Sequence, residues 1–144
     1  MVLSLFSFFF DMIISNHQMR RDESREDYLE AILQLSFVKD FVRSVDIARA
    51  MGFSKPSVSI AMNKLSDEKL VVIDGKGHIT LTQEGMEIAH KVYEKHMKIA
   101  QLLIKKGVSE KVAYEDACRL EHDLSDETWN IIKKDIEKVI GRID

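Results

Sequence analysis

The sequence predicts a mainly α protein with one small β-hairpin, in which an N-terminal winged helix-turn-helix precedes an α-helical dimerisation domain. Three observations predict this fold. Two short helical segments meet at a glycine turn, two β-branched runs flank a glycine-rich turn, and a long helix downstream carries an apolar seam. A β-hairpin that follows a helix-turn-helix is a wing, so the order of the elements carries the prediction.

Composition limits the class of protein. The 144 residues are 45% hydrophobic, which is enough to fill the cores of one or two small globular domains. The 21 Lys and Arg against 24 Asp and Glu give a formal net charge of −3, so no overall field attracts nucleic acid and any DNA contact must be local. The single cysteine excludes an internal disulfide and suits a reducing cytoplasm, where we expect the protein to act.

The first 18 residues, MVLSLFSFFFDMIISNHQ, differ from the rest of the chain. They are apolar, and the composition changes abruptly to charged and helical at Met19. The segment lacks the basic start and the cleavage site of a signal peptide, and Asp11 interrupts a run already too short to span a bilayer. We therefore expect no membrane contact, translation from Met19, a winged helix-turn-helix over residues 19–82 and a helical domain over residues 83–144.

Caps and apolar spacing define the first two helices. Ser24 and Asp27 have the spacing of a capping box at the start of the first helix. The apolar face of that helix comprises Tyr28, Leu29, Ile32 and Leu33. Ser44 is the expected cap of a short second helix that ends at Met51, and Gly52 is its expected terminator.

The third helix begins at Ser54, a cap, and tolerates Pro56 in its first turn. Its buried stripe comprises Val58, Ala61, Met62 and Leu65. In a helix-turn-helix this helix enters the major groove, where Ser and Lys donate to phosphates or bases and Pro contacts a thymine methyl. The candidate DNA-contacting residues are Ser54, Lys55, Pro56, Ser57, Ser59, Asn63, Lys64 and, on the wing, Lys76. A solvated helix face with a cap explains any one of them equally well.

The wing and the long helix follow. Residues 70–73 and 78–81 are β-branched runs around the turn at residues 74–77. Thr82 is placed to cap a helix from Gln83 to about Lys106. Its seam, which indicates a dimerisation helix, comprises Ala89, Val92, Tyr93, His96, Ala100 and Leu103.

Two further helices, headed by Ser109 and Ser125, complete the chain. The apolar face of the last helix comprises Trp129, Ile132, Ile136, Val139 and Ile143. The whole C-terminal half is therefore predicted to be helical.

The stretch ACRLEHD places Cys118 three residues before Glu121 and four before His122. Such spacings bring side chains together on one helix face, and thiolate, carboxylate and imidazole all ligate transition metals. The alternative is that the cysteine is a small buried residue and that the other two are solvated.

Two other places offer further metal ligands. Asp27 and Glu30 lie three residues apart on the first helix, and His96 lies on the seam of the long helix. Each has a structural alternative, because an acid in a first turn completes a cap and a histidine on an apolar stripe is commonly a satisfied core residue. The residues taken singly do not decide between ligand and structural roles.

Taken together, the motifs resemble a known family, the metal-dependent repressors typified by the diphtheria toxin repressor and the manganese transport regulator. The resemblance runs from about Ser24 to Ile143 and is carried by EDYLEAI, SVDIARAMGFSKPSVSIAMNKL, VVIDGKGHITLTQEG, YEKHMKIAQLL and DACRLEHDLSDE. It implies that residues 83–144 bind metal and dimerise, and that metal bound between the two domains stabilises the DNA-binding form. The ligands it implies are Asp27, Glu30, His96, Cys118, Glu121 and His122.

The chain combines features of both branches of this family. Asp27 and Glu30 resemble the manganese branch, whereas Cys118 resembles the iron branch. Ala100 and Tyr114 stand where the iron branch has second-site ligands, and the chain ends before an extra C-terminal domain, so the resemblance implies two domains and one metal per chain.

The expected function is that of a homodimeric repressor which binds a palindromic DNA operator when Fe(II) or Mn(II) is bound, with Fe(II) favoured by the thiolate. It is not expected to be an enzyme. Three alternatives stay open: a winged-helix regulator that senses a non-metal ligand, a metal-dependent hydrolase, which lacks a spare base beside the ligands, and a metal-buffering protein, against which the winged helix-turn-helix argues.

Overall fold

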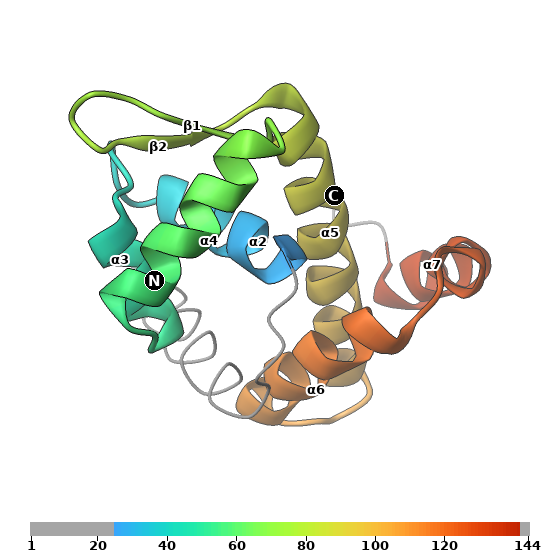
Figure 1. Ribbon diagram of the computed structural model, residues 1–144. Coiled ribbons are helices and arrows are strands. Elements are labelled where there is room, and N and C mark those ends of the chain that lie inside the picture. Colours follow the sequence, from blue (N-terminus) through green and yellow to red (C-terminus); the bar gives the residue numbers. More distant parts are fainter. Residues whose placement is uncertain (1–24, 142–144) are drawn as a thin grey trace. The chain divides into compact units, whose positions relative to one another are not determined.

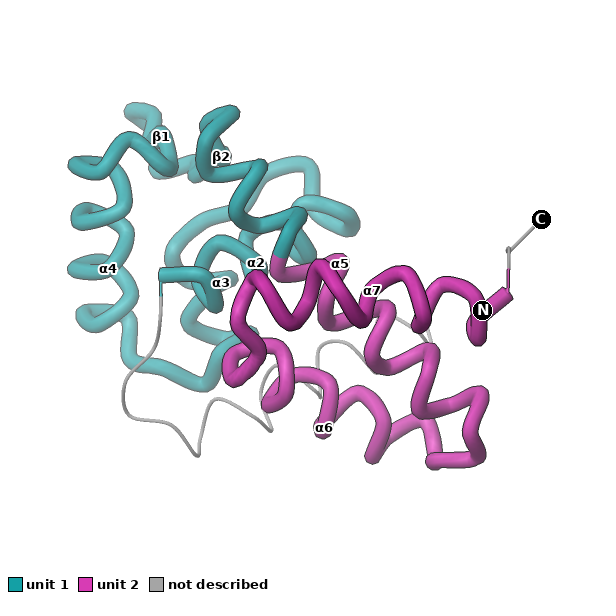
Figure 2. The backbone as a smooth tube through the Cα atoms, turned by 90° about the vertical axis from the view of Figure 1, so that its right-hand side faces the viewer, with its two compact units in different colours: residues 1–91 teal, residues 92–144 magenta. Residues whose placement is uncertain are grey.

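The structure, a computed structural model, describes residues 25–141 as helices α2 to α7 and the hairpin β1–β2 (Figure 1). The chain divides into two compact units, Met1–Lys91 and Val92–Asp144 (Figure 2). The predicted boundary after residue 82 stays a prediction, because compactness and function need not divide a chain at the same place. The predicted leader over residues 1–18, the Ser24 cap and Ile143 lie outside the described residues.

In the first unit, α2 (Arg25–Ser36), α3 (Ser44–Met51) and α4 (Lys55–Asp67) have the predicted order. Their shared core contains fully buried side chains from each helix. These are Leu29, Ile32, Ile47, Met51, Val58 and Met62. The predicted stripe of α4 is thus confirmed, except that Ala61 at its edge is only half-buried.

The start of α3 differs in one detail from the prediction. Ser44 is the first helical residue and not the cap, since Arg43 occupies the N-cap position. The backbone N–H of Arg43 donates to the Asp46 carboxylate over 2.9 Å. The Asp46 carboxylate in the first turn therefore bonds the backbone of the N-cap residue, and the Ser44 hydroxyl is not the cap.

The turn between α3 and α4 follows the prediction. Gly52 has a φ of 70°, the left-handed conformation that glycine adopts without steric cost. The N–H of Phe53 donates to the Ala48 carbonyl over 3.0 Å and closes α3. The Ser54 hydroxyl then accepts from the N–H of Ser57 and begins α4. The predicted helix-turn-helix is confirmed.

The Asp46→Asn variant should have a lower free energy of unfolding than the parent at neutral pH, and this difference should shrink in acid. Burial raises the pKa of Asp46, but hydrogen bonds from Lys39 Nζ (2.6 Å) and the Arg43 N–H outweigh it and hold that pKa below 3.8. A carboxyl group whose pKa is lower in the folded state stabilises the fold at pH values above its unfolded-state pKa. That stabilisation is lost as the pH falls through the folded-state pKa. We expect a loss of about 1 kcal/mol at neutral pH that shrinks below pH ~4. Urea unfolding of both proteins across this range measures it, and a pH-independent difference would contradict the assignment.

The wing is an antiparallel hairpin of β1 (Val71–Ile73) and β2 (Ile79–Leu81) with Val71 paired to Leu81. The Asp74 carboxylate shapes the predicted turn, because it accepts from the N–H groups of Lys76 (2.8 Å) and His78 (2.9 Å). The N–H of Ile79 donates to the Val42 carbonyl over 2.7 Å. This bond fastens the wing to the segment before α3.

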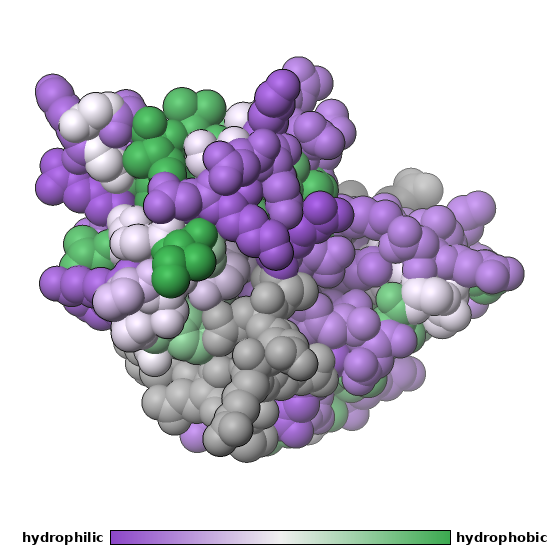
Figure 3. All heavy atoms as spheres, viewed as in Figure 1, coloured by the Kyte–Doolittle hydropathy of each residue, from purple (hydrophilic) through white to green (hydrophobic). Residues whose placement is uncertain are grey.

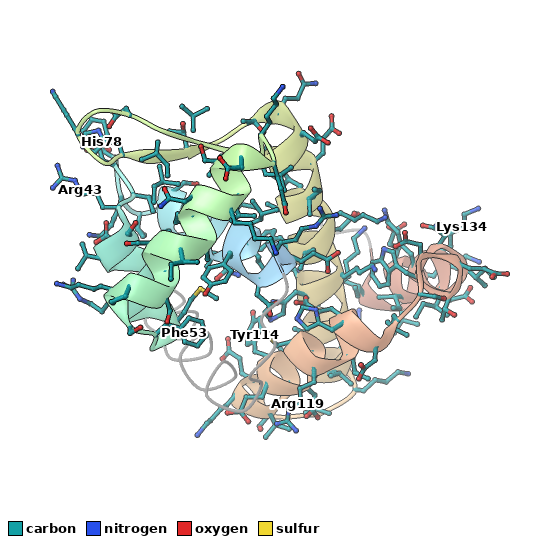
Figure 4. The ribbon with its side chains drawn as sticks, in the orientation of Figure 1. Arg43, Phe53, His78, Tyr114, Arg119 and Lys134 are labelled. Carbon is teal, nitrogen blue, oxygen red and sulfur yellow. The ribbon has the colours of Figure 1, made fainter. Side chains whose placement is uncertain are left out.

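A side-chain contact adds to this attachment. His78 of the wing stacks on Phe41 with ring centroids 4.2 Å apart, and its Nε2 lies 3.2 Å from Nη2 of Arg43. Figure 4 shows Arg43 and His78 near each other at the turn end of the wing. The wing is therefore held against the helix-turn-helix at both backbone and side-chain level.

The helix α5 (Gln83–Lys105) begins where predicted, and the Thr82 hydroxyl accepts from the N–H of Gly85 over 3.1 Å. The same hydroxyl donates to the Lys69 carbonyl over 2.8 Å. Thr82 thus both caps α5 and fixes its start beside the wing.

Gly85→Ala should lower the free energy of unfolding by about 2 kcal/mol, the usual scale of overpacking in a close-packed interior. A Cβ at Gly85 would lie 2.0 Å from the backbone carbonyl oxygen of Leu70, so the backbone itself must move. Urea unfolding measures the loss. The matched control is Gly75→Ala, because nothing lies within 4 Å of a Cβ there. Equal stability of the two variants would contradict the close approach.

The second unit contains the C-terminal half of α5 together with α6 (Glu110–Asp123) and α7 (Asp126–Ile140). Ser125 caps α7 by accepting from the N–H of Thr128 over 3.1 Å, whereas the Ser109 side chain makes no capping hydrogen bond to α6. An ion pair between Lys133 and Glu94 (2.8 Å) joins α7 to α5.

The predicted apolar faces are confirmed in part. On the seam of α5, Ala89, Val92, His96 and Ala100 are buried, and Tyr93 and Leu103 are half-buried. On α7, Trp129 and Ile136 are buried, but Val139 is exposed. Seven residues bring Ile136 back to the face of Trp129, whereas ten residues turn Val139 about 80° away from it. None of the described helices is long and apolar enough to cross a membrane.

Candidate metal centre

Two helices of the second unit bring three metal-ligand types together. His96 points inward from α5, and Cys118 and Glu121 share a face of α6 because they are three residues apart. One ligand atom from each of the three residues lies within 4.8 Å of the other two. The spacing of Cys118 and Glu121 on α6 already predicted that these two side chains lie together. The packing of α6 in this unit brings His96 to the same place.

The group is largely shielded from water. His96 is 1% exposed and Glu121 is 4% exposed, whereas Cys118 is half-buried. Oε2 of Glu121 lies 3.7 Å from Nδ1 of His96, and Oε1 lies 3.3 Å from Nε2 of His122. The Glu121 carboxylate is therefore flanked by two imidazoles. A buried carboxylate needs such polar or cationic partners, because its desolvation is costly.

These residues fit a first-row divalent metal. They combine one imidazole, one thiol and one carboxylate in a site that excludes most water, and imidazole with carboxylate and thiolate is a donor set for Fe(II), Mn(II) or their neighbours. A cation would balance the buried negative charge of Glu121. His122, half-buried on the next position of α6, extends the donor set toward the edge of the unit.

The resemblance implies a single metal because Ala100 and Tyr114 stand where the iron branch has ligands for a second one, and neither residue is a carboxylate or an imidazole. Ala100 is fully buried and offers only a methyl group. Tyr114 is 5% exposed, and its ring meets that of His96 edge-on with centroids 6.3 Å apart. Burial, with the charge of Glu110 adding to it, raises the pKa of Tyr114 above 10.0. The phenol therefore stays neutral at physiological pH, which makes it a poor substitute for a carboxylate ligand.

The other two predicted ligands lie on α2 in the first unit. Asp27 is half-buried in the first turn of α2, where its negative charge also interacts favourably with the helix dipole. Glu30 is 6% exposed, and its Oε1 accepts from Nε2 of Gln34 over 3.0 Å. These two residues and the four of the second unit belong to separate bodies, so the joint set of six stays a prediction.

The predicted DNA-contacting residues share one property: all are exposed. They are Ser54, Lys55, Pro56, Ser57, Ser59, Asn63, Lys64 and Lys76. The hydroxyls of Ser54 and Ser57 are engaged with each other over 2.8 Å, so their first role is in the cap. Ile60, which is 71% exposed on the same helix, is not among the predicted DNA-contacting residues. Its helical position opposite the Val58 and Met62 stripe could have revealed it.

Comparison with known proteins assigns each half of the chain to a known protein family. Residues 22–79 match the family described as "Iron dependent repressor, N-terminal DNA binding domain". Residues 82–139 match "Iron dependent repressor, metal binding and dimerisation domain". The chain belongs to the iron-dependent repressor family. The predicted resemblance and fold class are thereby confirmed.

Individual members of the family agree. The chain is 36% identical over 125 residues to the uncharacterized HTH-type transcriptional regulator MJ0568 of Methanocaldococcus jannaschii, covering 84% of this chain and 98% of the relative. It is 34% identical to the HTH-type transcriptional regulator MntR of Geobacillus kaustophilus, covering 77% of each chain. The solved manganese regulator SloR has a TM-score of 0.68 and 32% identity, and covers 80% of this chain.

The chain spans 54% of the SloR chain, or about half of that solved structure. The relatives with named roles are transcriptional regulators, as expected for a winged helix-turn-helix with a dimerisation domain. Membership of this family identifies the chain as a metal-dependent transcriptional repressor of the manganese and iron type. The identity of the ligating and DNA-contacting side chains in this chain is a separate question.

Proposed function

We propose that this protein is a homodimeric repressor which binds a palindromic DNA operator when Fe(II) or Mn(II) is bound. The observation that carries the proposal is the buried group of His96, Cys118 and Glu121, whose ligand atoms lie within 4.8 Å of one another. The exposed polar face of α4 and the wing support the DNA-binding half. Such a repressor is not an enzyme and acts where the DNA lies, which we take to be the cytoplasm.

Each half of the protein has a distinct task in this proposal. The N-terminal residues of α4 approach base edges, and Lys55, Lys64 and Lys76 neutralise phosphates. A dimer presents two α4 helices to half-sites about one helical turn, roughly 34 Å, apart. Exposed apolar side chains of α6 in the second unit, such as Val112 and Leu120, are available for the partner subunit.

The proposed ligands come from both units. Asp27 and Glu30 contribute hard oxygen donors from α2. The donors of the second unit are His96, Cys118, Glu121 and His122. A divalent ion would supply the free energy that favours the DNA-binding state, by its differential affinity for the two states. Ligands from both units are what such linkage requires.

A gel-shift titration with and without chelator tests the proposed function. DNA selected from a random duplex pool serves as the probe, and the panel of ions includes Fe(II), under anaerobic conditions, and Mn(II). We expect tight binding only with metal. Equal affinity in chelator would reject the mechanism and favour a winged-helix regulator of a non-metal ligand. A hydrolase would instead reveal itself by turnover in an activity screen of the metal-loaded protein.

Lys55→Ala separates the DNA contact from the metal site. Lys55 is exposed in the first turn of α4, so its loss should weaken DNA binding of every sequence alike. The slope of log affinity against log salt should fall by about one for each subunit. Metal affinity should be unchanged by direct titration. An unchanged salt slope would show that Lys55 does not contact phosphate.

A further inference from the structure

The outward face of α4 contains one large apolar side chain. Ile60 is 71% exposed, more than any other large hydrophobic residue in the described part of the chain. Figure 3 shows a hydrophobic spot over α4, bordered by pale and hydrophilic side chains. An isoleucine so exposed contributes nothing to the core, and β-branching makes it a poorer helix former than Lys, Gln or Arg. Folding therefore gives no reason for an isoleucine here.

The position of Ile60 on the helix is central to the proposed DNA-contacting face. At about 100° per residue, Ile60 points opposite the buried stripe of Val58, Met62 and Leu65. The residues within about 60° of Ile60 are all exposed. They are Pro56, Ser57, Asn63, Lys64 and Asp67. Ile60 is thus the one large aliphatic side chain on this face, which it shares with the smaller ring of Pro56 and with polar groups that would face DNA.

The major groove offers one apolar feature that matches such a side chain. Of the four bases, only thymine presents a methyl group there, at C5. The neighbouring Ser, Asn and Lys side chains can pair with phosphates and base edges but cannot bury a methyl group. Pro56, in the first turn of α4, and Ile60 are the apolar side chains of this face that can. A branched alkyl side chain at the centre of the face has the chemistry to do so.

We propose that Ile60 is a specificity-determining residue that packs on the C5-methyl group of one thymine in each operator half-site. The inference rests on the proposed function, because it requires α4 to enter the major groove. It adds a feature of the sequence that the operator must contain. Apolar contact also excludes water from the neighbouring polar contacts of Ser57 and Lys64.

The test pairs a protein change with a base change. The metal-loaded parent first selects sites from a random duplex pool, and each thymine of the selected site is then replaced by deoxyuridine, which lacks only the methyl group. For the parent, one position in each half-site should lose about fourfold in affinity, the value of one buried methyl-sized group. Ile60→Ala should bind the thymine and deoxyuridine duplexes equally well at that position.

A matched variant controls for the loss of an exposed isoleucine. Ile131 on α7 is 65% exposed, and Ile131→Ala should keep the fourfold discrimination of the parent, since it lies outside the DNA-binding unit. Ile60→Ala removes an exposed side chain and raises helix propensity, so the fold should persist. Its metal affinity should also be that of the parent.

The outcomes separate this inference from the function on which it rests. If the parent binds selected DNA only with metal, but Ile60→Ala retains the same discrimination against deoxyuridine, the proposed function stands and the role of Ile60 is overturned. If the metal-loaded parent selects no DNA sequence at all, the proposed function itself fails. Loss of discrimination in Ile60→Ala, with retention in Ile131→Ala, supports the inference.

Discussion

Glu121→Gln is expected to weaken metal-activated operator binding by about 100-fold or more, while the protein stays folded. The side chain is 4% exposed and lies between the His96 and His122 rings. An amide keeps the shape of the side chain and one acceptor oxygen, but it replaces the other oxygen with an N–H donor and removes the negative charge that favours a divalent ion. Metal titration by gel shift and by calorimetry measures the loss. Glu115→Gln, the same change at a half-buried site on α6, is the matched control and should behave as the parent.

Stability without metal distinguishes the ligand role of Glu121 from a purely structural one. If the carboxylate serves mainly as a ligand, Glu121→Gln removes a buried charge, so the metal-free protein should be as stable as the parent or more so. If the carboxylate forms a structural ion pair with His96, the metal-free variant should be less stable and its metal response unchanged. The second pattern would remove Glu121 from the proposed ligand set.

Features decided by neighbouring residues could be predicted from the sequence. The Gly52 terminator, the Ser54 cap and the wing turn each depend on contacts within a few residues, and each has the predicted structure. The cap of α3 was assigned wrongly. The helix begins one residue earlier than a Ser44 cap requires, and the Asp46 carboxylate, which also accepts from Lys39, bonds the N–H of Arg43 at the N-cap.

Features decided by packing were harder to predict. The approach of His96 to Glu121 depends on how α6 packs against α5, which no spacing within one helix can determine. Val139 was assigned to a buried face because apolar residues at helical spacing are usually buried. Ile60 was overlooked for the same reason, since an exposed apolar residue has no signal of its own until the buried stripe beside it is fixed.

Replacing Cys118 should change which metal activates the protein. A thiolate favours Fe(II) and later metals, whereas oxygen and imidazole donors suit Mn(II), the weakest binder of the series. Cys118→Glu therefore rebuilds a manganese-type set and should move the response toward Mn(II). Cys118→Ala, which supplies no donor, should weaken activation by every metal by about 10-fold or more. Gel-shift titrations with each ion measure both effects.

The half-buried position of Cys118 makes a packing role the competing explanation, and Cys118→Ser tests it. Serine keeps the size of the side chain and replaces the soft sulfur with a hard, weakly ligating hydroxyl. If sulfur ligates the metal, the serine variant should resemble Cys118→Ala and lose its preference for Fe(II) over Mn(II). If all three variants respond to both ions at the concentrations that activate the parent, Cys118 only fills space on α6. His96 and Glu121 would then have to bind the metal without a thiolate, and the preference for Fe(II) would have no basis in this chain.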